Sequence, residues 1–176
     1  MGFRLFKIMS LYSFLILALF FCSTELRAQE TAFFEEQKET KLPIPRFVSL
    51  GSEHVNLRSG PGTRYPIRFT ISKEGLPVEV IGEFDVWRQI RDHEGDEGWV
   101  HKAMLSGKRT GFVRADNIFI LNRPEDAGRK VALLEKGVIV DINQCDKKFC
   151  SIKILGYSGF VPQDMLWGVY PHENFK

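Results

Sequence analysis

Two tryptophans, a tyrosine and an arginine in the first half of the chain could form a binding surface. Arg58 and Tyr65 flank a glycine-rich loop, and Trp87 and Trp99 follow in two separate apolar segments. Aromatic side chains beside a cleft can stack on a sugar or an extended peptide, and an arginine can bind an anionic group. The pattern therefore predicts reversible recognition, with Arg58, Tyr65, Trp87 and Trp99 as ligand-binding residues. In the competing interpretation the two tryptophans only cover a core, because large aromatic side chains are mostly buried in small domains.

Cys145 and Cys150 are the second candidate for chemistry. They stand at the two ends of an expected hairpin, between apolar segments at 138–144 and 151–155. Cysteines that face each other across an antiparallel ladder lie close enough for a disulfide. A redox-active pair is disfavoured, because the spacing is not C-x-x-C and no βαβ pattern surrounds it. We therefore predict a disulfide that stabilises one hairpin by roughly 2 kcal/mol, since the closed loop is short.

No set of residues indicates catalysis or a metal centre. The four histidines show no metal-ligand spacing. The acidic turn at 92–97 does not have the spacing of an EF-hand loop. His101 could be imagined as a general base, but no nucleophilic serine or free cysteine stands in a recognisable motif. The sequence therefore predicts no catalytic residues, no metal and no other cofactor.

The charge balance argues against nucleic acid as a partner. The chain has 24 basic and 22 acidic residues. Residues 1–28 hold three of the basic residues (Arg4, Lys7 and Arg27) and one acidic residue (Glu25), so 21 of each kind remain. A segment without formal net charge has no electrostatic reason to bind nucleic acid or anionic lipid.

The first 28 residues have the order of a secretory signal. Arg4 and Lys7 precede an apolar run from 8 to 22, which is followed by Ser23, Thr24 and the tripeptide at 26–28 (LRA), and we expect cleavage after Ala28. This run is short for a membrane-spanning helix, which needs roughly 20 residues. We expect export, with the periplasm as the favoured compartment. An uncleaved anchor is the alternative, and it would be the chain's link to a membrane.

The remainder is built from two copies of one unit. Residues 75–80 (GLPVEV) recur 62 positions later as 137–142 (GVIVDI), and Trp87 falls on Phe149 at the same offset. Self-similarity at a fixed period indicates a repeat architecture. The predicted organisation is a signal peptide at 1–28, a disordered leader at 29–45, repeat one at 46–109, repeat two at 110–171 and a C-terminal tail at 172–176.

Each repeat is expected to form a small all-β barrel. The strands of repeat one are predicted at 54–58, 69–72, 77–83, 87–92 and 97–101. These segments are rich in Val, Ile, Phe and Trp, alternate with Gly, Pro and Asp, and show no helical period. Five short antiparallel strands can close around one core. The short connection at 106–110 indicates that the two barrels pack side by side.

The repeat alignment predicts one more interaction. At an offset of 62 residues, Cys145 and Cys150 fall on Glu83 and Arg88. An opposite-charge pair therefore replaces the disulfide at the matching hairpin. We expect the two side chains to face each other across the strands, in a cross-strand pair worth roughly 0.2–1 kcal/mol.

The motifs of repeat one resemble those of bacterial SH3-like domains. The resemblance rests on 55–66 (VNLRSGPGTRYP), 75–81 (GLPVEVI), 87–91 (WRQIR) and 97–101 (EGWVH). The second repeat, with its ending at 166–171 (LWGVYP), is similar to the exported tandem form of this family. The resemblance implies a binding module of the cell envelope that is not an enzyme, with peptidoglycan or an envelope protein as its partner. The alternative is a structural scaffold for a dedicated periplasmic protein.

Overall fold

The computed structural model describes residues 42–125 and 128–176. The predicted signal peptide and nearly all of the predicted leader lie outside the described residues. By its internal contacts the chain divides into Met1–Thr40 and Lys41–Lys176, and everything below concerns the second unit. None of its described helical turns has the length and apolar character that a bilayer crossing requires.

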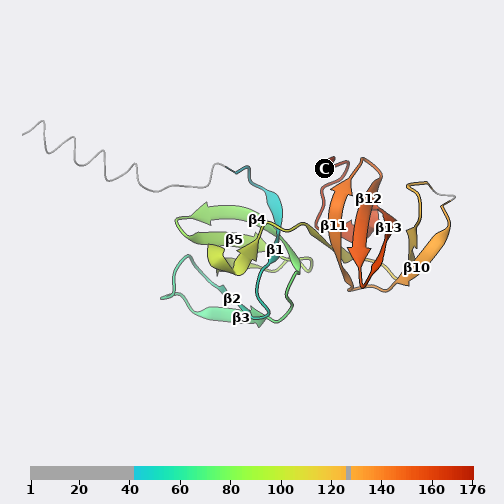
Figure 1. Cartoon of the computed structure of the whole chain (residues 1–176). Coiled ribbons are helices and arrows are strands. Elements are labelled where there is room, and N and C mark those ends of the chain that lie inside the picture. Colours follow the sequence, from blue (N-terminus) through green and yellow to red (C-terminus); the bar gives the residue numbers. More distant parts are fainter. Residues whose placement is uncertain (1–41, 126–127) are drawn as a thin grey trace, which may run out of the picture. The chain divides into compact units, whose positions relative to one another are not determined.

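The first barrel is one seven-stranded antiparallel sheet (Figure 1). Its strands pair in the order β3-β2-β6-β5-β4-β1-β7. The bounds are β1 Arg46–Leu50, β2 Val55–Arg58, β3 Ile67–Ile71, β4 Pro77–Phe84, β5 Trp87–Arg91, β6 Glu97–His101 and β7 Leu105–Ser106, with a 3-10 turn at Lys102–Met104 before β7. The five predicted strands are present, within two residues at each end. The prediction of five strands missed β1 and β7, which pair with each other and close the sheet beside β4.

The second barrel repeats this arrangement strand by strand. Its order, β10-β9-β13-β12-β11-β8-β14, is that of the first barrel with every label raised by seven. The bounds are β8 Thr110–Val113, β9 Ile118–Leu121, β10 Lys130–Leu134, β11 Ile139–Cys145, β12 Phe149–Ile154, β13 Tyr157–Pro162 and β14 Leu166–Trp167, with a 3-10 turn at Gln163–Met165. The all-β fold and the tandem duplication are therefore confirmed.

Strand β8 is buried on both of its faces. Val113 is fully buried in the core of the second barrel. Its neighbour Phe112 points to the other side and is 7% exposed within the core cluster of the first barrel, where Ile139 and Trp167 of the second barrel also pack. Successive side chains of a strand point to opposite faces, so one strand can serve two cores. The core of the first barrel is thus completed by residues of the second.

Polar contacts join the two barrels at the same place. Thr110 Oγ1 donates a hydrogen bond to Gly75 O at 2.7 Å, and the hydroxyl of Tyr170 donates to Glu79 Oε1 at 3.0 Å. Gly168 of the second barrel has φ +114°, and a Cβ there would lie 2.4 Å from Thr110 O and 3.0 Å from Pro77 Cβ of the first barrel. Only glycine suits this backbone conformation and this close approach. These contacts agree with the packing that the short connection at 106–110 predicts.

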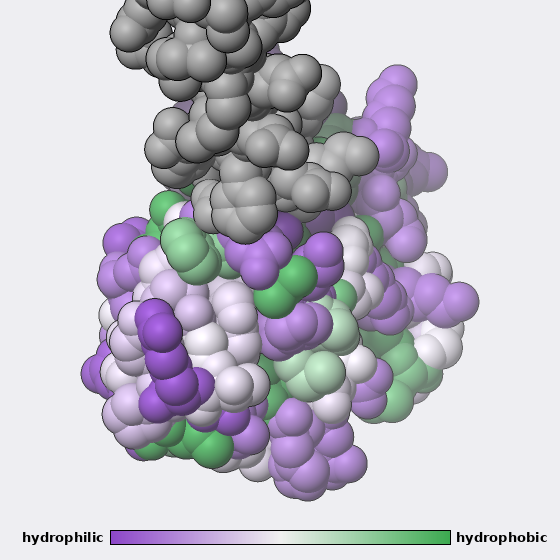
Figure 2. Space-filling view, turned by 90° about the vertical axis from the view of Figure 1, so that its left-hand side faces the viewer, coloured by the Kyte–Doolittle hydropathy of each residue, from purple (hydrophilic) through white to green (hydrophobic). Residues whose placement is uncertain are grey.

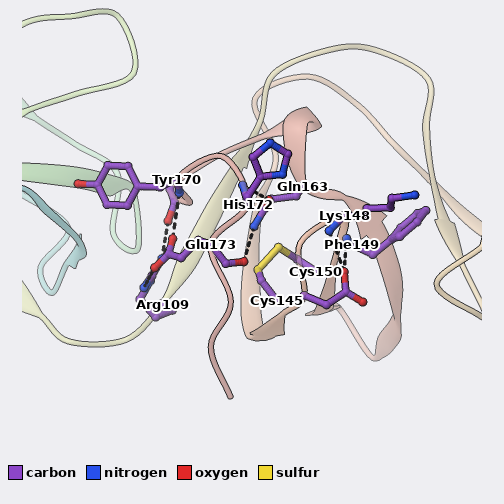
Figure 3. Close-up of a disulfide and its surroundings, with 11 residues drawn as sticks. Arg109, Cys145, Lys148, Phe149, Cys150, Gln163, Tyr170, His172 and Glu173 are labelled. Atoms are coloured by element: carbon purple, nitrogen blue, oxygen red, sulfur yellow. Dashed lines mark hydrogen bonds and ion pairs between the residues drawn. A yellow bond between two sulfur atoms is a disulfide. The ribbon is translucent and has the colours of Figure 1, made fainter.

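Residues 172–176, which the sequence marks as a tail, are attached to the second barrel. Glu173 receives two hydrogen bonds from the guanidinium of Arg109, at 2.9 and 3.0 Å (Figure 3). Phe175 and Cys145 exchange both of their backbone hydrogen bonds, at 3.0 and 3.1 Å. The end of the chain therefore extends the pairing of β11.

The two matching hairpins are closed by different chemistry. Cys145 and Cys150 are paired in the ladder with Cα atoms 4.0 Å apart, and they form the predicted disulfide. In the first barrel Glu83 and Arg88 are paired in the same way, and Arg88 Nε lies 3.2 Å from Glu83 Oε1, as predicted. Their side chains are only 6% and 3% exposed, and Arg46 Nη2 adds a second contact to Glu83 at 2.5 Å. The pair is therefore buried, whereas the sequence suggested an ordinary cross-strand pair.

Loss of the disulfide is expected to weaken the second barrel. We expect the Cys145→Ala/Cys150→Ala variant to have a free energy of unfolding lower by roughly 2 kcal/mol, because the short loop is no longer constrained in the unfolded chain. Urea unfolding with and without a reductant measures this change. The wild-type protein should lose stability in the reductant, and the double variant should not respond to it. Identical curves for all four samples would contradict the prediction.

Candidate functional site

The structure brings three of the four predicted binding residues to one face of the first barrel. Trp99 in β6 is directly opposite Arg58 in β2 on one side and Gln89 in β5 on the other, while Trp87 is opposite His101. Side chains of directly opposed residues share a face of the sheet. Along β5 and β6 the residues of this face alternate with buried residues, so the face points away from the core. Both tryptophans are half-buried, and neither belongs to the described core cluster.

A glycine brings β2 and β6 close enough to form this face. A Cβ at Gly98 would lie 2.6 Å from Leu57 Cγ and 2.9 Å from Arg58 O. A side chain at this position would push the two strands apart and open the barrel. Gly98 therefore sets the neighbouring positions of Arg58 and Trp99.

Arg58 and Tyr65 also order the glycine-rich loop. Arg58 Nη1 donates to Thr63 O at 3.2 Å and to Tyr65 O at 2.9 Å. The ring of Tyr65 lies against Gly60, where a Cβ would come within 2.5 Å of it. Both bonds come from Nη1. A guanidinium has five N–H donors in all, so those on Nε and Nη2 take no part in ordering the loop. Tyr65 is thus linked to the face through Arg58.

The cavities at the barrel junction are lined by other residues. The larger one has a volume of about 850 Å³. Its lining includes Phe47 and Arg91 of the first barrel together with Arg114, Lys147, Lys148, Trp167 and Tyr170 of the second. No sequence pattern marks this cavity, because its lining residues are far apart in the chain. The one local signal was the Lys147–Lys148 pair between the cysteines.

Tyr170 of the cavity lining and Asp146 of the turn that carries Lys147 and Lys148 have shifted pKa values. Burial and the hydrogen bond to Glu79 raise the pKa of the Tyr170 phenol well above its usual range, so the phenol stays protonated and remains a donor. The backbone amides of Phe149 and Lys148 donate to Asp146 Oδ1 and lower the pKa of that carboxyl (Figure 3). The charged form of Asp146 therefore holds the turn that carries the two lysines.

The acidic turn of the first barrel is explained by its own hydrogen bonds. Carboxylate oxygens of Asp92, Glu94 and Asp96 all lie within 4.8 Å of one another. Asp92 Oδ1 accepts from the backbone amides of Glu94 and Asp96 at 3.0 and 2.9 Å. This pattern is that of an Asx turn, in which the aspartate orders the loop.

Comparison with known proteins gives one family and several similar solved structures, which include two proteins from Trichomonas vaginalis. A family model described as a bacterial SH3 domain matches residues 51–107 and 114–168. NlpC2 from Trichomonas vaginalis is 16% identical over 72% of this chain and 49% of its own, with a TM-score of 0.33. NlpC1 from the same organism is 18% identical over 73% and 47%, with a TM-score of 0.32. The chain thus spans about half the length of these two proteins. A comparison with curated protein sequences gives no match.

Proposed function

Because the chain belongs to the bacterial SH3 domain family, we propose that it is a non-enzymatic binding protein of the cell envelope. Its ligand in this proposal is peptidoglycan or an envelope protein. Domains of this family typically bind cell-wall components and are often extracellular or periplasmic. The signal-like order of residues 1–28 supports export of this chain.

The observation that carries the proposal is the outward face shared by Arg58, Trp87 and Trp99. Half-buried indole rings present apolar area at little cost in conformational freedom, and they can stack on a sugar or a peptide. The N–H donors of Arg58 other than Nη1 have no acceptor among residues 42–125 and 128–176, and they can bind a carboxylate. On the side drawn in Figure 2, hydrophobic residues are scattered among hydrophilic ones and form no single patch. Such a mixed surface favours reversible recognition over permanent association.

A scaffold for a dedicated periplasmic protein is the second candidate. The observation in its favour is the position of Phe112, which makes the core of the first barrel depend on the second. Two barrels that share core residues present their surfaces in a fixed arrangement. A partner protein could recognise that arrangement without any cell-wall ligand.

Co-sedimentation with purified cell-wall sacculi tests the first proposal. We expect the wild-type protein to pellet with the sacculi, and Trp87→Ala to bind at least tenfold more weakly, a loss of about 1.4 kcal/mol. Arg58→Ala should also bind more weakly, because it loses the donor to the anionic group and loosens the loop.

Phe119→Ala is the matched control. Phe119 is a half-buried aromatic residue of the second barrel that lies outside the described core clusters, and its loss should leave pelleting unchanged. Failure of the wild-type protein to pellet would reject the cell-wall ligand and favour the scaffold. Equal losses in Trp87→Ala and Phe119→Ala would reject the proposed face.

A further inference from the structure

We propose that the cavity of about 850 Å³ at the barrel junction is a docking site for an acidic peptide segment of a partner protein. It is separate from the face of Arg58, Trp87 and Trp99, none of which lines it. The proposal therefore does not depend on binding to the cell wall.

Cationic side chains outnumber carboxylates in the lining of this cavity. Four cationic side chains (Arg91, Arg114, Lys147 and Lys148) contribute to it, against the carboxylates of Glu79 and Asp164. Arg91 is already paired with Glu79 and Glu97, at 3.3 and 2.7 Å. Arg114, Lys147 and Lys148 are exposed and have no ion pair among the described residues. Residues 29–176 have no formal net charge, so this positive surface is a local concentration that attracts anions.

The cavity also has an aromatic wall, formed by Phe47, Trp167 and Tyr170. The rings of Trp167 and Tyr170 both pack on Phe47, with centroids 5.2 and 4.7 Å from it. Trp167 Nε1 is buried and has no acceptor among the described residues. A buried donor without a partner carries a free-energy cost, which an acceptor on a bound ligand would remove. The wall thus offers apolar area, and its indole N–H still lacks a partner.

The size and layout of the cavity favour a chain over a compact anion. A volume of this size is typical of sites for organic ligands. Arg114 follows β8, whereas Lys147 and Lys148 lie in the turn between β11 and β12, so the cations come from separate elements. Separate cations suit several carboxylates along an extended peptide, and the aromatic wall suits apolar side chains between them.

The backbone of the turn that carries Lys147 and Lys148 is ordered before any ligand binds. The disulfide closes the ends of the β11–β12 turn. Asp146 accepts two backbone hydrogen bonds inside it, at 2.8 and 2.7 Å, and Gln163 N donates to Lys148 O at 2.8 Å. A surface that is ordered in advance loses less conformational entropy on binding. The Cys145–Cys150 bond therefore supports the docking site as well as the hairpin.

Fluorescence anisotropy with a labelled hexapeptide of alternating glutamate and alanine tests the proposal. We expect the purified wild-type protein to bind it, and the Gln-Ala analogue to bind at least tenfold more weakly. Lys147→Glu/Lys148→Glu should also lose at least tenfold, a change of about 1.4 kcal/mol. The control Lys102→Glu/Lys153→Glu changes the net charge equally at exposed lysines outside the lining, and should lose less than twofold. Reduction of the disulfide should weaken binding too.

Three outcomes would overturn the proposal. Equal losses in the two lysine variants would mean that only the net charge matters. Equal binding of the two peptides would mean that the site recognises apolar groups alone. Displacement by inorganic phosphate or by a soluble muropeptide at the peptide's own concentration would assign the cavity to those ligands. Sacculus binding by Lys147→Glu/Lys148→Glu is expected to be normal, so the two proposed sites can fail separately.

Discussion

Replacement of Phe112 by alanine is expected to destabilise the first barrel, although Phe112 belongs to a strand of the second. The side chain is 7% exposed, lies in the core cluster of the first barrel, and has its ring centroid 3.9 Å from that of His93. Truncation of a buried phenylalanine costs about 3–5 kcal/mol, because apolar contact is lost and a cavity remains. Guanidinium unfolding followed by tryptophan fluorescence measures the change, and hydrogen exchange shows where it occurs.

Phe119→Ala is the control for this experiment as well. Phe119 is an aromatic residue of β9, the next strand along the chain, and lies outside the described core clusters. Its loss should lower the free energy of unfolding by less than about 1 kcal/mol, as at other sites away from the core. In Phe112→Ala, amide exchange should accelerate most in β4 and β5 of the first barrel. A change confined to the second barrel would show that the two cores are independent.

The internal repeat carried most of the fold prediction. The match of 75–80 to 137–142 predicts equivalent strands. These are β4, which lies between β5 and β1, and β11, which lies between the equivalent strands β12 and β8. The disulfide was predicted from the hairpin that its two cysteines end, and the offset of 62 residues then located the Glu83–Arg88 pair, because a ladder places the ends of equivalent hairpins in equivalent register. Of the two strands of repeat one that were missed, β7 has only two residues, and two residues cannot show alternation.

The contacts between the barrels could not be predicted from the sequence. The segment 110–113 (TGFV) is buried throughout, but a pattern of apolar residues does not say which core each side chain enters. Tyr170 bonds to Glu79, 91 residues earlier, and no local pattern predicts such a pair. Arg58, Trp87 and Trp99 share a face because the alternation of side chains within β5 and β6 is local. Whether they bind a ligand stays a prediction.

Removal of the Glu83 carboxylate is expected to be as harmful as the loss of Phe112. Arg88 is 3% exposed, and its other bonds from Nη1 go to the backbone carbonyls of Asp85 and Trp87. Glu83→Ala leaves the guanidinium buried without its counter-charge, and breaking one side of a buried ion pair costs about 3–5 kcal/mol. The free energy of unfolding in urea measures this loss.

Two double variants separate the charge from the packing. Glu83→Ala/Arg88→Ala should be more stable than Glu83→Ala alone, because no charge remains buried without its partner. Glu83→Cys/Arg88→Cys places in the first barrel the bridge that the second barrel uses, at paired positions of the same ladder. We expect it to recover stability under oxidising conditions and to lose it in a reductant, since the bond constrains the unfolded chain. Strictly additive effects of the two single alanine substitutions would refute this account, because coupling between Glu83 and Arg88 is what it requires.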